Sequence, residues 1–160
     1  TLVGTIGDIG CFSFFSNKVI TTGEGGMVCT NSESLAGKIK LLRDHGMDPK
    51  KRYWHDVAGF NFRMTNLQAA VGVAQMEQLP GFVQKKQYIG KFYKSNLKGV
   101  GDIEFQHIKN DVEHNNWLFT IQTTKQKELL QYLNSNKILM SLGIASLTLL
   151  FILLFYFSFL

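Results

Sequence analysis

Lys18 is the residue of this 160-residue chain whose type and setting most suggest chemistry. It lies in the run FSFFSNKVITTGEGGMV, after a group of aromatic residues and before a glycine-rich turn. A lysine that reacts as an amine with a carbonyl compound needs a rigid support and surroundings that lower its pKa. Two plainer interpretations stand beside this one: a solvated lysine and an ordinary hairpin turn at GEGG. The glycines complete neither GxxxxGK[ST] nor GxGxxG, so no phosphate loop is predicted from them.

The cysteines and the charges argue against two other kinds of site. Cys11 and Cys29 form no CxxC and no Cys/His ligand spacing, so we expect no metal site. We interpret them as buried thiols of a reducing compartment, with a disulfide as the alternative. The net charge is +5, but lysine and arginine are scattered rather than gathered on one helix or between aromatic residues. We therefore expect no nucleic-acid partner.

The elements that must position Lys18 are short strands alternating with helices. The pattern predicts strands over Gly10–Phe15 and Met27–Thr30, joined through the glycines. A helix follows, with Leu35, Ile39 and Leu42 on one face, a cap at Asn31 or Ser32, and a stop at Gly46. This alternation indicates an α/β fold in a chain long enough for one domain.

A long irregular segment, 47–63, separates this part from the helices beyond it. Thr65 and Gln68 have capping-box spacing and predict a helix that ends near Pro80. A further helix is expected before Gly99. A strand over Trp117–Thr123 and an amphipathic helix over Lys125–Asn136 complete the prediction.

The motifs, taken in order, resemble a known family. GDIGCFSFFSNKVITTGEGGMVCTN, LLRDHGMD, KRYWHDVAGFNFRMTNLQAAVGVAQMEQL and HNNWLFTI are similar to the DegT-type (DegT/DnrJ/StrS) nucleotide-sugar aminotransferases, most closely the perosamine-synthase-like members, from Thr1 to about Lys137. The resemblance implies a fragment of a fold-type I, aspartate-aminotransferase-like enzyme that depends on pyridoxal 5′-phosphate. Residues 1–80 would be the C-terminal part of its large domain, and residues 81–137 the start of its small domain.

The resemblance also implies a reaction and a role for Lys18. The family transfers an amino group, typically from glutamate, to a keto nucleotide-sugar for polysaccharide or glycoconjugate synthesis. The lysine at the place of Lys18 binds the cofactor covalently and moves a proton between cofactor and sugar. Related sugar dehydratases carry histidine there, so lysine favours transamination. The alternative function is a catalytically inactive remnant, serving at most as a membrane-tethered interaction module.

Four further residues are implied by their places in the motifs. Ser13 would hold the cofactor phosphate, or be a strand serine bonded to the backbone. Arg63 would reach the partner's cofactor phosphate across a homodimer interface, a task that suits a guanidinium, or form an ordinary surface ion pair. His45 and Tyr53 would line the substrate site, or be a helix-stop histidine and a packing aromatic.

Both ends of the chain depart from the family pattern. The aspartate that pairs with the pyridinium nitrogen, the ring-stacking aromatic and a glycine-threonine phosphate turn are expected upstream of Thr1. Residues 138–160 form an uncharged apolar run long enough to span a bilayer. This tail is a membrane anchor, a gene-model artefact or an unrelated segment, and we favour an artefactual or decayed end. The expected location is cytoplasmic, or membrane-anchored if the tail is genuine, since no signal peptide opens the chain.

Overall fold

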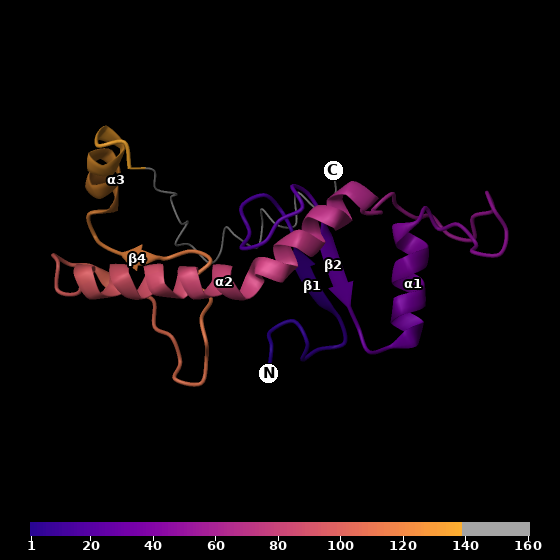
Figure 1. Ribbon diagram of the computed structural model, residues 1–160, viewed down its shortest axis with the longest axis horizontal. Coiled ribbons are helices and arrows are strands. Elements are labelled where there is room, and N and C mark those ends of the chain that lie inside the picture. The colour runs from indigo at the N-terminus through magenta and orange to yellow at the C-terminus, as the bar shows by residue number, and fades with distance from the viewer. Residues whose placement is uncertain (139–160) are drawn as a thin grey trace. The chain divides into compact units, whose positions relative to one another are not determined.

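The computed structural model describes residues 1–138 (Figure 1). It divides the chain into two compact units, Thr1–Lys86 and a second that begins at Gln87. Each is described here by itself. The predicted domain boundary after residue 80 remains a prediction.

The first unit contains a two-stranded antiparallel sheet and a capped helix. Strands β1 (Gly10–Ser13) and β2 (Gly26–Cys29) pair with Phe12 opposite Met27. Helix α1 (Glu33–Arg43) begins after Ser32, whose Oγ accepts a hydrogen bond from Leu35 N at 3.3 Å. The two predicted strands and the helix with its serine cap are confirmed, because local pattern and capping chemistry agree here.

Helix α2 (Asn66–Leu97) is longer than the sequence predicted. The predicted capping box is present: Thr65 N donates to Gln68 Oε1 at 2.9 Å, and Gln68 N donates to Thr65 Oγ1 at 3.2 Å. The predicted helix end near Pro80 is wrong, because Pro80 lies inside α2. A proline removes one backbone hydrogen-bond donor from a helix. Here the residues on both sides of Pro80 remain helical.

The second unit adds two short strands and one helix. Strands β3 (Glu104–Phe105) and β4 (Ile121–Gln122) are antiparallel, and α3 (Gln126–Ser135) follows. The strand predicted over Trp117–Thr123 is reduced to Ile121–Gln122. Asp102 accepts hydrogen bonds from the hydroxyls of Thr123 and Thr124 and from the backbone N–H of Thr124, and these bonds hold its pKa well below the usual value. The carboxylate thereby ties the start of α3 to the turn before β3.

Side chains in the described part of the chain are poorly covered. Within residues 1–138 no hydrophobic residue is buried, and the one buried polar residue is Thr22, at 8% exposed. Cys11 and Cys29 are exposed, so the prediction of buried thiols is wrong. Their strands form a sheet of only two members, which leaves side chains on both strands open to solvent.

The apolar tail predicted over 138–160 lies outside the described residues, apart from Ile138. Up to that residue, no helix has both the length and the apolar character needed to cross a bilayer.

Candidate functional site

Lys18 lies in a tight bend that starts where β1 ends. Ser13, the last residue of β1, accepts a hydrogen bond on its Oγ from Phe15 N at 3.3 Å. Lys18 N donates to Phe15 O at 3.0 Å. The Lys18 side chain is half-buried. The predicted cofactor lysine and the predicted phosphate-binding serine therefore flank the same residue, Phe15.

The chain after Lys18 returns to the end of β1 through a polar network, and we call residues 14–26 the Lys18 loop. Phe14 O accepts from Thr22 N at 3.0 Å and from Thr21 Oγ1 at 2.9 Å. Thr22 Oγ1 donates to Glu24 O at 2.6 Å. Gly25 has a φ of 140°, and a Cβ there would lie 2.7 Å from Thr22 Oγ1. This position of the loop therefore requires glycine.

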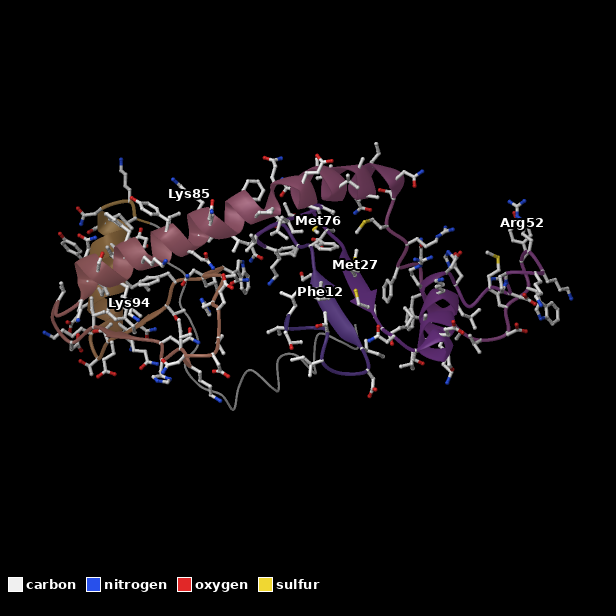
Figure 2. All side chains as sticks on the ribbon, turned by 60° about the horizontal axis from the view of Figure 1, so that its bottom comes forward. Phe12, Met27, Arg52, Met76, Lys85 and Lys94 are labelled. Carbon is white, nitrogen blue, oxygen red and sulfur yellow. The ribbon has the colours of Figure 1, made fainter. Side chains whose placement is uncertain are left out.

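Side chains of helix α2 form hydrogen bonds to the backbone of the Lys18 loop. Thr21 N donates to Gln75 Oε1 at 3.3 Å, and Gln68 Nε2 donates to Glu24 O at 3.1 Å. Gly72 lies between these two contacts, and a Cβ there would approach Thr22 Cγ2 to 3.0 Å. The loop is thus fixed by side chains about 50 residues away in sequence. Figure 2 shows Phe12 and Met27 on the hairpin of β1 and β2, and Met76 on α2.

The second group of predicted residues lies at the end of α1. His45 has a φ of 61° and donates its N–H to Phe60 O at 2.8 Å, so it takes the left-handed position after the helix. Gly46 follows it, and its N–H donates to Leu41 O at 2.9 Å. The predicted helix stop is present, but the first left-handed residue is histidine rather than glycine.

Arg63 is held at the same place by an ion pair. Its Nη1 lies 3.3 Å from Asp44 Oδ1, with side chains 52% and 32% exposed respectively. The Asp44 oxygen is buried and accepts no hydrogen bond from the described residues, so the contact is electrostatic rather than a well-formed hydrogen bond. About half of the Arg63 side-chain surface remains open, and its guanidinium has five N–H donors, so donors are left for a further anionic group.

Tyr53 lies at the exposed end of the loop 47–58. It is 74% exposed with a φ of 66°, and the Arg52 guanidinium lies 4.9 Å from its ring centre. Lys51 Nζ lies 3.8 Å from the ring centre of Trp54. Figure 2 shows Arg52 on this protruding loop, pointing away from the ribbon. The described residues therefore leave most of the Tyr53 ring uncovered, apart from the contact with Arg52.

The five predicted residues therefore occupy three places within the first unit. Ser13 and Lys18 share one turn. His45 and Arg63 lie at the end of α1, where Arg63 pairs with Asp44, the residue before His45. Tyr53 lies on the exposed loop. Sequence reasoning missed Asp44, Thr22 and Gln75. The only local signal was the capping box, which identified Gln68 but not its bond to the Lys18 loop.

Comparisons with known proteins give a consistent result. The model of the DegT/DnrJ/EryC1/StrS aminotransferase family matches residues 1–144, seven residues beyond the predicted end of the resemblance. The GDP-perosamine synthase of Caulobacter vibrioides is 44% identical over 120 residues, which are 74% of this chain and 32% of that protein. The GDP-perosamine synthase of Vibrio cholerae is 42% identical over 141 residues, covering 85% of this chain and 38% of that protein.

Solved structures agree in fold. Helicobacter pylori PseC, an aminotransferase involved in the biosynthesis of pseudoaminic acid, superposes with a TM-score of 0.76 at 32% identity, over 84% of this chain and 37% of that one. The predicted fold class, α/β and part of a fold-type I architecture, is confirmed. The chain spans about a third of the length of the curated relatives it matches.

Proposed function

Because this chain belongs to the DegT/DnrJ/EryC1/StrS aminotransferase family, we propose that it serves the transfer of an amino group from an amino acid, typically glutamate, to a keto nucleotide-sugar. The family works with pyridoxal 5′-phosphate, and we propose the same cofactor here. Two of the relatives described above are named as GDP-perosamine synthases, which supports a nucleotide-linked sugar as the acceptor.

The observation that carries this proposal is the geometry around Phe15. One turn carries a primary amine at Lys18 and a hydroxyl at Ser13: the Lys18 backbone N–H donates to Phe15 O, and the Ser13 hydroxyl accepts from Phe15 N. An amine suits the aldehyde of the cofactor, and a hydroxyl and a guanidinium suit its phosphate. The donor set of the chain therefore fits this group.

In the proposed reaction the cofactor, when bound, supplies an electron sink for the carbon next to the transferred nitrogen. Lys18 Nζ would hold the cofactor before the amino donor enters, and would then carry a proton between the cofactor and the sugar carbon that receives the amino group. Ser13 Oγ binds a phosphate oxygen. His45 and Tyr53 face the sugar nucleotide, where Tyr53 offers an exposed ring and hydroxyl.

We further propose a homodimer with composite sites, in which Arg63 binds the cofactor phosphate of the partner subunit. The exposure of the Arg63 side chain supports this role, and the ion pair with Asp44 involves Nη1 alone. The competing interpretation is an ordinary surface ion pair, for which the exposure of the two groups would predict a contribution of at most about 1 kcal/mol.

Replacing Lys18 tests the proposal. In the complete protein that carries this chain, Lys18→Ala should abolish covalent cofactor binding and reduce amino transfer by roughly three orders of magnitude or more, because both use one amine. Lys38→Ala, an exposed lysine on α1, is the matched control and should leave both unchanged. Turnover retained in Lys18→Ala would remove Lys18 as the catalytic residue.

Subunit mixing tests the composite site. Lys18→Ala and Arg63→Ala are each expected to be impaired, whereas a mixed dimer contains one site with neither defect. Mixing equal amounts of the two impaired proteins should therefore restore up to about a quarter of the wild-type activity. With random pairing about half of the dimers are mixed, and each mixed dimer has one of its two sites intact. Absence of recovery in folded, exchanging subunits would place Arg63 in its own subunit's site or outside any site.

A further inference from the structure

Two glutamines of α2 hold the Lys18 loop through opposite ends of their amide groups. Gln68 donates from Nε2 to Glu24 O at 3.1 Å, and Gln75 accepts on Oε1 from Thr21 N at 3.3 Å. They are seven residues apart, two helical turns, and so lie on the same face of α2. Both side chains are half-buried.

Gln68 has a second task in the same structure. Its Oε1 accepts from Thr65 N at 2.9 Å and from Thr65 Oγ1 at 3.0 Å, which completes the capping box of α2. Its Nε2 is directed to the Lys18 loop instead. One side chain therefore joins the start of the helix to the turn at Glu24.

These contacts restrain the part of the loop that follows Lys18 and returns to the end of β1, which we call the returning arm. Thr21 and Glu24 belong to that arm, and Phe14 O binds it back to the end of β1 through the Thr21 hydroxyl and the Thr22 N–H. Lys18 lies between the two arms. Fixing the returning arm against α2 thus limits the positions open to the backbone at Lys18.

From this arrangement we propose that Gln68 and Gln75 are positioning residues for Lys18. The inference rests on the proposed function, in which the Lys18 amine must meet both cofactor and substrate carbon. Small displacements of a reacting group lower rates steeply, and a catalytic side chain needs supports that are themselves fixed. The two glutamines act on the reaction only through the loop.

The competing explanation is that Gln68 serves the helix cap alone, and one substitution separates the two roles. Glutamate is as good as glutamine in a capping box, and its charge suits a helix N-terminus. Near pH 7 it has no proton to donate, so Gln68→Glu keeps the cap but sets a carboxylate against Glu24 O. At position 75 the role is reversed, because Gln75→Glu keeps the acceptor that Thr21 N needs.

Gln78 provides the matched control on the same helix. It is exposed, and its Nε2 donates to Ala74 O at 3.2 Å, within α2 itself. Gln78→Glu makes the same chemical change without touching the Lys18 loop. Gln75→Leu removes the acceptor for Thr21 N while keeping a side chain of similar size, and it is compared with Gln75→Glu.

Amide hydrogen exchange at pH 7 in the complete protein measures directly how often the backbone of the Lys18 loop opens. We expect exchange in residues 14–25 to rise roughly three- to tenfold in Gln68→Glu and Gln75→Leu, the effect of losing one hydrogen bond. In Gln75→Glu and Gln78→Glu it should change by less than about twofold. Helix content should be unchanged in Gln68→Glu. Equal responses of Gln68→Glu and Gln78→Glu, or of Gln75→Leu and Gln75→Glu, would overturn the proposal.

Steady-state kinetics test whether the restraint matters for Lys18. Gln68→Glu and Gln75→Leu should lower kcat roughly three- to tenfold and change KM for the sugar nucleotide by less, because the reacting amine is misplaced while the substrate site is intact. Faster exchange with unchanged kcat would overturn the positioning role. Failure of the proposed function itself would show differently, as activity retained in Lys18→Ala, with the exchange results unaffected.

Discussion

The Lys18 loop and the segment 44–63 are held in place by different means. In the Lys18 loop, the backbone bond from Thr22 N to Phe14 O is supplemented by side chains from α2, which bind the backbone at Thr21 and Glu24. In the segment 44–63, the backbone binds the backbone: Phe60 N and Phe62 N donate to carbonyls of Leu42 and Arg43 in the last turn of α1. The side-chain bonds restrain single residues of the Lys18 loop. The backbone bonds fix the base of segment 44–63 and leave its far end exposed.

The two arrangements suit the two proposed roles. A lysine that holds a cofactor needs one accurate position, and a loop that faces a sugar nucleotide needs an accessible surface, such as Tyr53 provides. The difference predicts that the two regions respond to different substitutions.

The largest effect is expected at Gly46, at the base of segment 44–63. Its φ is 70°, and a Cβ there would lie 2.0 Å from Val57 O. Gly46→Ala combines a left-handed alanine with a clash against backbone, so we expect the free energy of unfolding to fall by about 3 kcal/mol or more. Urea denaturation measures it. Gly37→Ala, in open space on α1, should instead raise stability by about 0.5–1 kcal/mol. Equal effects of the two substitutions would show that the base is not close-packed.

A smaller effect is expected at Thr22, inside the Lys18 loop. Thr22→Val removes the hydroxyl that donates to Glu24 O and should lower the free energy of unfolding by about 1–2 kcal/mol. Hydrogen exchange should rise in residues 14–25 and not in residues 47–58. Thr22→Ser keeps the hydroxyl and should cost less than about 1 kcal/mol. A uniform rise in both segments would contradict the separate supports.

The smallest effect is expected from the ion pair between Asp44 and Arg63. Both side chains are partly exposed, so a double-mutant cycle with Asp44→Asn and Arg63→Gln should give a coupling free energy of at most about 1 kcal/mol. Thermal or urea unfolding of the four proteins supplies the numbers. A coupling above about 1.5 kcal/mol would mean that the pair, rather than the backbone bonds, fixes the base of segment 44–63.

Local features of the fold were predictable from sequence, and the longer-range ones were not. The Ser32 cap and the Thr65–Gln68 capping box depend on residues three apart, and both are present. Pro80 was misleading, because the cost of one lost hydrogen bond does not end a helix whose other bonds remain. The strand Glu104–Phe105 is too short to give a periodic signal.

The site shows the same division. Lys18 and Ser13 were predicted by resemblance to the family, and their common turn around Phe15 lies within six residues of sequence. The contacts that support this turn join residues 54 and 44 positions apart. No pattern in a single sequence identifies such pairs, since glutamines on a helix are usually solvated. Their roles became visible only when the bonded atoms of each amide were known.

The central claim, that Lys18 is the residue that holds the cofactor, is tested most directly by locating the covalent attachment. The complete protein is incubated with pyridoxal 5′-phosphate, reduced with borohydride to fix the bond, digested and mapped by mass spectrometry. The account predicts one cofactor-derived group per chain, on Lys18, and none at that position in Lys18→Ala. Stoichiometric attachment at another lysine, or substoichiometric attachment spread over exposed lysines such as Lys38 and Lys98, would contradict it.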